Sequence, residues 1–443
     1  MVRVTRLDTG RCELYLKLES QNPGGSIKDR IGLSMIDAAE RSGVLRPGGT
    51  IVEATAGNTG LGLALVAGRK GYKLILVVPD KMAREKILHL TAMGADVRTT
   101  RSDVGRGHPQ YYQDMAQRIA TELPGALYIN QFANPANAQA HEDTTGPEIL
   151  SQMQDRVDAV VCGVGSGGTM SGLSHFFARA APATKMVLAD PVGSILADYV
   201  HTGKVGSASS WAVEGIGEDF VPSILDLSRV RHAYSIPDAE SFATARELLL
   251  KEGILGGSSS GTLLAAALRY CREQTRAKRV VTLVCDSGAK YLSKMFNDAW
   301  MIERGYLNRG HSGDLRDLIV RRHDAGLTVT VQPGDSLLVA YNRMRAAEVS
   351  QLPVIDDRGE IVGIIDEYDL LAEVRRPGEP APFNRLVQVA MTANLQTLAP
   401  SASLDALVEV FDAGRVAIVV DRGHFIGLIT RVDLLNALRM KIR

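Results

Sequence analysis

A lysine at the start of a predicted helix is the first residue whose position suggests chemistry. The turn Asn22–Gly25 leads to Lys28, and a helical pattern follows as far as Ser42. The positive end of a helix dipole favours the neutral form of an amine, which is the form that makes a Schiff base. A solvated lysine in the first turn of a surface helix would have the same local sequence. This segment alone leaves both interpretations open.

Two loops place backbone N–H groups where an anion could bind. Glu53–Gly60 lies between an apolar run and a helical pattern, and the free N–H groups of a helix start bind carboxylates or phosphates. Asn58 or Thr59 could instead serve only as the helix N-cap. Val160–Thr169 has the same placement, and its glycines would let the backbone wrap closely around a phosphate.

The second loop also fits a different cofactor. Gly163, Gly165 and Gly168 satisfy the Gly-x-Gly-x-x-Gly pattern of dinucleotide-binding folds, and Asp190 ends the next apolar run. A glycine loop that only permits close packing is a third alternative. A further segment, with Ser258 at another helix start, is by itself best explained as a helix cap.

Together, Ser26–Arg30 and three glycine-containing segments resemble the motifs of the β-family (fold-type II) pyridoxal-phosphate enzymes, both in sequence and in their order along the chain. The three segments are Glu53–Gly60, Val160–Thr169 and the segment with Ser258. The resemblance covers residues 10–305 and outweighs the dinucleotide alternative. It implies pyridoxal phosphate as cofactor and Lys28 as the catalytic residue that carries it. The other cofactor contacts that it implies are Asn58, Gly165, Ser166, Gly167, Gly168, Thr169 and Ser258. The substrate contacts that it implies are Thr55, Ala56, Gly57, Thr59, Gln131 and Gly215.

Within this family the sequence resembles two branches, the cystathionine β-synthases and the O-acetylserine sulfhydrylases. Glu214–Phe220 is similar to the synthase motif, with Glu218 in place of a tyrosine, and its acidic groups could hold the amino group of homocysteine. Gln131–Asn137 is closer in sequence to the sulfhydrylase motif. Ala56 replaces the serine that is usual in the carboxylate-binding loop of this family. The paired repeats of the tail favour the synthase branch.

The resemblance therefore implies a lyase that performs β-replacement. L-Serine would condense with L-homocysteine to give cystathionine, or cysteine would replace serine with release of hydrogen sulfide. A neutral hydroxyl at Ser258 would leave the pyridine nitrogen largely unprotonated, which favours loss of the β-substituent over transamination. The alternatives are a sulfhydrylase with a regulatory tail and, from another class, a non-catalytic nucleotide-sensing scaffold.

Repeated βαβ units must position these residues. Short apolar runs alternate with helical stretches over residues 13–305, which predicts mostly parallel sheets. In the tail, Gly359–Leu371 aligns without a gap with Gly423–Leu435, and each copy predicts helix, strand, turn, strand and helix. The expected fold is an α/β fold-type II enzyme with two parallel-sheet subdomains, followed by an α+β pair of CBS domains.

We expect four parts: a catalytic domain (1–306), a linker (307–325) and two CBS repeats (326–380 and 381–443). In CBS-domain pairs an Asp at a helix start binds the ribose of a ligand. Thr430 and Asp433 are therefore the expected regulatory residues for an adenosyl ligand. The same two residues would also form a simple helix cap. In the first copy, Asp366 and Asp369 are better explained as a cap.

Composition excludes several other partners. The 50 basic and 50 acidic residues cancel, which argues against nucleic acid. No apolar run approaches the roughly 20 residues that span a bilayer, so no membrane is expected. The four cysteines are scattered, which favours free thiols in the cytoplasm, and no spacing predicts a metal site. We also expect amino-acid substrates, no haem, and a homodimer or higher homo-oligomer.

Overall fold

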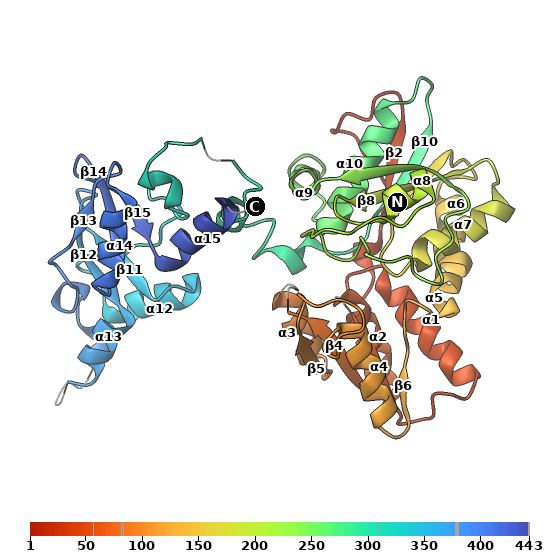
Figure 1. The fold of residues 1–443 in the computed structure, drawn as a ribbon, viewed down its shortest axis with the longest axis horizontal. Helices are drawn as coiled ribbons and strands as arrows, with labels where there is room; N and C mark the ends of the chain where they lie inside the picture. Colours follow the sequence, from red (N-terminus) through yellow and green to blue (C-terminus); the bar gives the residue numbers. More distant parts are fainter. Residues whose placement is uncertain (56, 81, 83, 309, 377–380, 442–443) are drawn as a thin grey trace. The chain divides into compact units, whose positions relative to one another are not determined.

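A computed structural model describes residues 1–55, 57–80, 82, 84–308, 310–376 and 381–441 (Figure 1). Its contacts divide the chain into an N-terminal unit, Met1–Phe296, and a C-terminal unit, Asn297–Arg443. The fold class expected from the sequence is confirmed, with two mostly parallel sheets in the first unit and a two-stranded and a three-stranded sheet in the second. The division into four parts at 306, 325 and 380 stays a prediction.

The larger sheet of the N-terminal unit has the order β1-β2-β10-β7-β8-β9. Its strands are β1 (Val2–Arg3), β2 (Glu13–Leu18), β7 (Ala159–Gly163), β8 (Lys185–Pro191), β9 (Val230–Ile236) and β10 (Arg279–Val284). All pairs are parallel except β1 with β2. Every residue of β8 after Lys185 is buried, as expected for a parallel sheet that helices cover on both faces.

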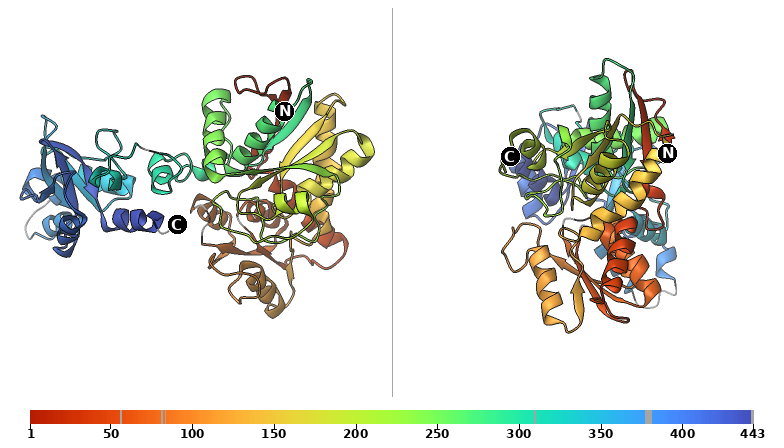
Figure 2. Two further views of the ribbon diagram at one scale, coloured as in Figure 1. Left: turned by 45° about the horizontal axis from the view of Figure 1, so that its top comes forward. Right: turned by 90° about the vertical axis from the view of Figure 1, so that its right-hand side faces the viewer.

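Helices on both sides cover this sheet. Figure 2 shows the green α9 and α10 on one side and the yellow α7 on the other. The helical segments of this part are η1 (Glu19–Gln21), α5 (Pro135–Ala140), η2 (His141–Thr145), α6 (Gly146–Gln152), α7 (Gly168–Ala180), α8 (Leu196–Thr202), α9 (Asp238–Glu252), α10 (Ser258–Arg272) and η3 (Gly288–Tyr291). Three of them, α5, α7 and α10, start within segments that the sequence singles out.

The smaller sheet has the order β5-β4-β3-β6 and is parallel throughout. Its strands are β3 (Thr50–Ala54), β4 (Lys73–Pro79), β5 (Asp96–Thr100) and β6 (Ala126–Tyr128). The helices around it are α1 (Lys28–Arg41), α2 (Asn58–Lys70), α3 (Arg84–Ala92) and α4 (Tyr112–Glu122). Buried aliphatic side chains of α1, α2 and β4 form one continuous core.

Two glycines let α1 and α2 cross with their backbones in contact. A Cβ on Gly32 would lie 2.5 Å from the carbonyl carbon of Gly62, and one on Gly62 would lie 2.5 Å from the carbonyl oxygen of Lys28. These separations are shorter than non-bonded carbon contacts, so only glycine fits at both positions. The crossing fixes Lys28 and Asn58, the first residues of the two helices, relative to each other.

The C-terminal unit contains two copies of a helix–strand–strand–helix repeat. The first is α12 (Leu337–Ala347), β11 (Gln351–Ile355), β12 (Ile361–Asp366) and α13 (Glu367–Val374); the second is α14 (Leu404–Asp412), β14 (Ala417–Asp421), β15 (His424–Ile429) and α15 (Arg431–Lys441). The other elements are α11 (Asp298–Glu303), η4 (Leu315–Leu318), η5 (Pro382–Asn384), η6 (Val387–Val389) and β13 (Thr397–Leu398). Gly359 and Gly423 both take positive φ at the hairpin turns, which confirms the repeat predicted from the sequence.

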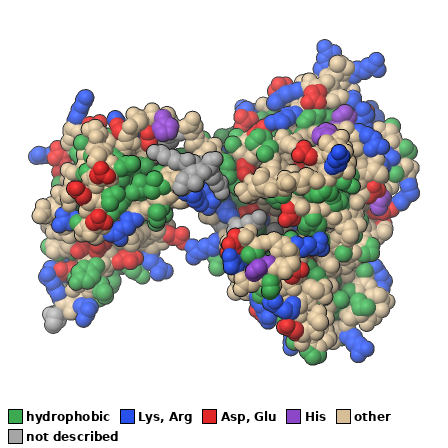
Figure 3. All heavy atoms as spheres, in the orientation of Figure 1, with side chains coloured by type: hydrophobic (Ala, Val, Ile, Leu, Met, Phe, Trp, Pro, Cys, Tyr) green, Lys and Arg blue, Asp and Glu red, His purple; other side chains and the backbone are tan. Residues whose placement is uncertain are grey.

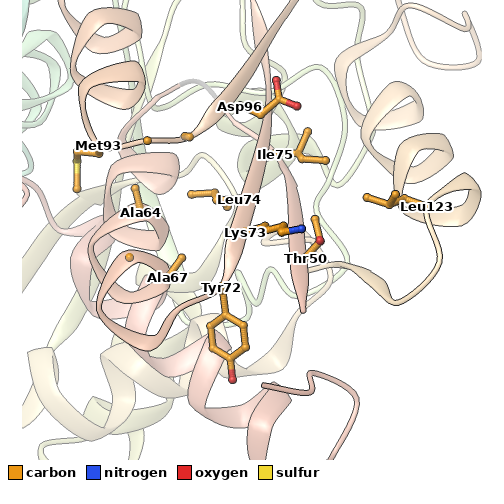
Figure 4. Close-up of a pocket in the computed structure, with 13 residues that line it drawn as sticks. Thr50, Ala64, Ala67, Tyr72, Lys73, Leu74, Ile75, Met93, Asp96 and Leu123 are labelled. Carbon is orange, nitrogen blue, oxygen red and sulfur yellow. The ribbon is translucent and has the colours of Figure 1, made fainter. Parts of the chain in front are cut away.

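A cavity of about 480 Å³ lies at the amino-terminal edge of the smaller sheet (Figure 4). Its lining includes Thr50, Lys73 and Asp96, the first residues of β3, β4 and β5. Ligands of open α/β sheets bind at the opposite edge, beyond the carboxyl ends of the strands. The functional site is therefore expected away from this cavity. In the described part of the chain, no helix has the length and apolar character needed to cross a membrane.

Candidate active site

Lys28 begins α1 directly beside the end of β10. The N–H of Ile27 donates a hydrogen bond to the carbonyl of Cys285 (2.9 Å), and the N–H of Lys28 donates to the Ser26 hydroxyl (3.2 Å). Burial lowers the pKa of Lys28, although the nearby Cys285, Glu218 and Asp286 act in the opposite direction. The amine is therefore easier to deprotonate than a surface lysine, as a Schiff-base former requires.

Asn58 is held between an acid and a base. Its Nδ2 donates to Asp286 Oδ2 (2.7 Å), and its Oδ1 accepts from Lys290 Nζ (3.0 Å). Asp286 Oδ2 also accepts from the Tyr291 hydroxyl (2.7 Å), while Asp286 Oδ1 is buried without a hydrogen-bond partner. The sequence motifs do not include Asp286, Lys290 or Tyr291. One sequence feature could have indicated Asp286 as a site residue. It lies just beyond an apolar run, at the carboxyl end of a strand, where ligands of α/β sheets bind.

Three glycines form a cradle at the start of α7. A Cβ on Gly165 would lie 2.6 Å from the carbonyl oxygen of Gly215, and one on Gly168 would overlap the side-chain amide of Asn137. Gly167 has a φ of 93° and precedes the helix without a side-chain cap. Because no side chain covers this helix start, its N–H groups are available to an anion such as a phosphate.

The two remaining residues of this loop are anchored by their hydroxyls. Ser166 Oγ accepts from Asn137 Nδ2 (2.9 Å), and Thr169 Oγ1 lies 3.2 Å from His141 Nε2. His141 Nδ1 in turn lies 2.9 Å from Thr145 Oγ1. His141 is buried, and desolvation lowers its pKa to about 3. No sequence pattern predicted a role for this imidazole, which lies on the π-helix η2.

The expected substrate loop follows β3. Thr59 Oγ1 donates to Gln131 Oε1 (2.7 Å), and Gln131 Nε2 donates to the last carbonyl of β3 (3.2 Å). The N–H of Gly57 donates to Thr55 Oγ1 (3.1 Å). The structure thus brings together Thr55, Gly57, Thr59 and Gln131, whereas Ala56 lies outside the described residues.

The buried carboxyl group of Glu53 supports the loop that follows β3. Glu53 Oε2 accepts from the N–H of Gln131 (3.2 Å), and its Oε1 is buried without a partner. Burial raises the pKa of Glu53 to about 8. A largely protonated Glu53 adds little negative charge next to the place where a substrate carboxylate would bind.

Ser258, the first residue of α10, accepts a hydrogen bond from the N–H of Glu214 (3.0 Å). The Glu214 carboxylate is itself bound by Lys86 Nζ (2.9 Å) and Lys294 Nζ (2.7 Å). Although burial alone would raise it, these two lysines lower the pKa of Glu214. Two lysines thus already neutralise Glu214. The expectation that acidic groups of Glu214–Phe220 hold the amino group of homocysteine stays a prediction.

The structure does not support a dinucleotide at the glycine loop, because Asp190 is not placed to bind a ribose. Asp190 is buried, and its Oδ2 accepts from the N–H of Ala197 (2.8 Å) in α8. It serves the start of that helix and does not face solvent, where a ribose would have to bind.

Thr430 and Asp433 lie in the C-terminal unit, at the start of α15. The N–H and hydroxyl of Thr430 donate to Asp433 Oδ2 (2.7 and 2.6 Å). In the first copy, Asp366 and Asp369 form a reciprocal capping box at the start of α13. The capping role is therefore present in both copies, and a ligand at Thr430 and Asp433 stays a prediction.

These residues suit pyridoxal phosphate. The amine of Lys28 could bond its aldehyde carbon, and the glycine cradle leaves room and N–H groups for its phosphate. Asn58 and Ser258 supply polar groups at two further helix starts. In the described part of the chain, no group of three His, Cys, Asp or Glu side chains could hold a metal ion.

Comparisons with known proteins agree with this arrangement. The family model "Pyridoxal-phosphate dependent enzyme" matches residues 1–286, and the model "CBS domain" matches residues 326–376 and 387–440. Among curated proteins, cystathionine beta-synthase of Oryctolagus cuniculus is 35% identical over 456 residues, covering 98% of this chain and 82% of the relative. Cystathionine beta-synthase of Dictyostelium discoideum is 33% identical over 454 residues, covering 99% and 90%.

The solved structures that match cover about two thirds of this chain. A hydrogen sulfide-producing enzyme of Fusobacterium nucleatum has a TM-score of 0.62 and 36% identity, covering 66% of this chain and 95% of that one. An O-acetylserine dependent cystathionine beta-synthase of Helicobacter pylori has a TM-score of 0.60 and 36% identity, covering 64% and 90%.

Proposed function

The chain belongs to the pyridoxal-phosphate dependent enzymes, among the cystathionine beta-synthases, and from this premise we propose that it condenses L-serine with L-homocysteine to cystathionine. The observation that carries the proposal is the convergence of Lys28, Asn58, Ser258 and the glycine cradle on one site. Cysteine can replace serine in the same reaction, with hydrogen sulfide as the second product.

Each residue has a defined task. Pyridoxal phosphate, when bound, supplies an electron sink that makes the α-proton of an amino acid acidic. Lys28 carries the cofactor and then accepts that proton as general base. The loop of Thr55, Gly57 and Thr59 binds the substrate carboxylate through N–H groups and hydroxyls.

The cofactor itself is held at its two ends. Residues Gly165–Thr169 bind the phosphate at the start of α7, and Ser258 offers a neutral hydroxyl to the pyridine nitrogen. Asn58, fixed by Asp286 and Lys290, orients the ring. Gln131 and Gly215 also contribute to substrate binding. Gln131 accepts a hydrogen bond from Thr59, and the backbone of Gly215 packs against Gly165.

A second candidate is the sulfhydrylase reaction, in which sulfide replaces the acetate of O-acetylserine. It is favoured by the sequence of Gln131–Asn137, which is closer to the sulfhydrylases. The solved O-acetylserine dependent relative is named a cystathionine beta-synthase, so it supports O-acetylserine as a first substrate but not sulfide as the nucleophile. The two reactions share the residues above and differ in the leaving group and the nucleophile.

Product analysis separates the candidates. The purified protein, loaded with pyridoxal phosphate, is given serine, O-acetylserine or cysteine, each with homocysteine and with sulfide. Serine with homocysteine should give cystathionine faster than O-acetylserine with sulfide gives cysteine. A preference of about a hundredfold the other way, or roughly 2.7 kcal/mol of transition-state binding, would assign the sulfhydrylase. Lys28→Ala should stay folded and lose turnover in every combination.

The proposal extends to cofactor, location and assembly. Pyridoxal phosphate is the one expected prosthetic group, and an absorption spectrum of the purified protein without a haem band checks this. Free thiols at Cys12, Cys162, Cys271 and Cys285 support a cytoplasmic location. The C-terminal unit takes an adenosyl ligand at one site near Thr430 and Asp433 at most, and the chain forms a homo-oligomer.

A further inference from the structure

The buried Lys290, in η3, ties the turn before α1 to the start of α2. Its Nζ donates to the carbonyl oxygens of Gly24 (2.8 Å) and Gly25 (3.2 Å) and to Asn58 Oδ1 (3.0 Å). Burial lowers the pKa of Lys290, and the charge of Asp286 is the largest influence in the opposite direction. The three oxygen acceptors match the three N–H groups of an ammonium, so these contacts favour the charged form.

A carboxylate holds the other end of the Asn58 amide. Asn58 Nδ2 donates to Asp286 Oδ2 (2.7 Å), which also accepts from the Tyr291 hydroxyl (2.7 Å). The Tyr291 oxygen in turn accepts from Lys86 Nζ (2.8 Å). Because an ammonium only donates and a carboxylate only accepts, every hydrogen bond from Lys86 to Lys290 has a fixed direction. The amide of Asn58 is therefore fixed in one of its two orientations.

This arrangement leaves one N–H group of Asn58 for a ligand. Nδ2 carries two N–H groups, and among the described residues Asp286 alone accepts from it. The amide oxygen is turned to Lys290. The polar group that Asn58 offers to a ligand is therefore an N–H, and the ligand atom that it meets must be an acceptor.

Pyridoxal phosphate has one polar group to which the proposed function assigns no partner. Lys28 takes its aldehyde carbon, Gly165–Thr169 its phosphate and Ser258 its pyridine nitrogen. The remaining group is the 3-oxygen of the ring, on the carbon next to the one that bears the aldehyde. The crossing of α1 and α2 fixes Asn58 relative to Lys28. Asn58 therefore suits the oxygen that lies beside the carbon bonded to Lys28.

We infer that Lys290, acting through Asn58, sets the position of the proton that the 3-oxygen of the cofactor shares with the nitrogen of Lys28. The inference rests on the proposed function and adds a positioning residue for its cofactor. An ammonium that donates to the amide oxygen polarises the amide and strengthens its N–H groups as donors. A stronger N–H stabilises the 3-oxygen as an anion, so the proton stays on the nitrogen of Lys28. The carbon bonded to that nitrogen is then more open to attack by the amine of a substrate.

The test compares the resting spectra of cofactor-loaded wild type, Lys290→Met and Lys290→Arg. The two proton positions absorb in different bands, one in the visible and one in the near ultraviolet, and no substrate is needed. Lys290→Met removes the ammonium, so the ratio of visible to near-ultraviolet absorbance should fall roughly threefold to tenfold. Lys290→Arg keeps a cation with N–H donors and should restore most of the ratio.

Lys70→Met is the matched control. Lys70 is the last residue of α2 and also ties α2 to α1, since its Nζ donates to Asp37 and Glu40. It lies at the opposite end of α2 from Asn58, so its removal should leave the ratio unchanged. An unchanged ratio in Lys290→Met, or an equal fall in Lys70→Met, would overturn the inference.

The variant Asn58→Ala distinguishes an action through the amide from a merely structural role of Lys290. Lys290 also holds the carbonyls of Gly24 and Gly25, so a structural role would act on Lys28 through that turn. In the Asn58→Ala background, Lys290→Met should therefore have no further effect on the ratio. A fall of the same size in both backgrounds, or loss of the cofactor from both Lys290 variants, would overturn the inference.

The spectrum and the product analysis can fail separately. If the wild type makes no cystathionine, the proposed reaction is overturned while this inference stands, because the spectrum needs no substrate. If the wild type binds no pyridoxal phosphate, both are overturned.

Discussion

At the scale of single residues, the neutral imidazole of His141 links the phosphate loop to its support. It bridges Thr169 and Thr145, and burial lowers its pKa from 6.5 to about 3. Between these two values the unfolded chain binds a proton that the folded chain does not. The stability that His141 contributes is thus fully present above pH 6.5 and is lost as the pH falls toward 3.

His141→Gln should therefore weaken the acid sensitivity of the fold. From pH 7 to pH 5, wild type should lose about 2 kcal/mol of unfolding free energy that the variant keeps, at roughly 1.4 kcal/mol per pH unit below 6.5. Urea unfolding at the two pH values measures the difference. His89→Gln, which removes an exposed histidine of the same unit, is the control. Equal pH dependence in wild type and His141→Gln would contradict the prediction.

The residues that the sequence identified differ from those that it missed in one physical respect. Lys28, Asn58 and Ser258 start helices after glycine-rich turns, so their positions follow from local chain geometry. His141 and Lys290 act through contacts with residues far away in the chain, Thr169 and Asn58. A local sequence pattern carries no information about contacts between residues that are distant in the chain.

At the scale of elements, the start of α15 has two possible uses. Asp433 accepts from the N–H and hydroxyl of Thr430, which caps the helix, and its contact with a ribose stays a prediction. Asp369 makes the equivalent bond to the N–H of Asp366 (3.0 Å) in the first copy. There a second carboxylate, Asp366, would repel a phosphate.

Asp433→Ala should abolish adenosyl binding, whereas Asp369→Ala should not. Each change removes one helix cap worth about 0.5–2 kcal/mol, so the pair separates loss of a ligand contact from loss of a cap. Calorimetry with S-adenosylmethionine, AMP and ATP on the full chain gives the number of sites. We expect one weak site in wild type or none. Tight binding at two sites per chain, or binding indifferent to Asp433, would refute this.

Element types were largely predictable, because buried parallel strands and repeated hairpins leave clear apolar patterns. The π-helix η2 was not, since the extra residue in its turn is stabilised by contacts of His141 and by no local preference. The short strand β13 was also missed, because two residues carry no periodicity.

At the scale of the whole molecule, the repeat of the C-terminal unit extends to its exposed surface. Hydrophobic side chains reach the surface of this unit (Figure 3). Those on the last helix of each copy occupy matching positions: Tyr368, Leu371 and Val374 on α13, and Val432, Leu435 and Leu438 on α15. A spacing of three residues puts each set on one face of its helix. Exposed apolar stripes of this kind are candidate contact surfaces, and in a homodimer the same surface of each copy would be covered.

Leu371→Glu combined with Leu435→Glu should reduce the oligomer. These leucines are the central residues of the two stripes and are 52% and 64% exposed, so the folded chain should tolerate the charges while a buried contact between copies should not. Light scattering after gel filtration, over a range of concentrations, gives the mass. Leu250→Glu in α9, at an isolated leucine that is 80% exposed, should leave the mass unchanged. A monomeric wild type, or a double variant with the wild-type mass, would show that the stripes serve some other contact.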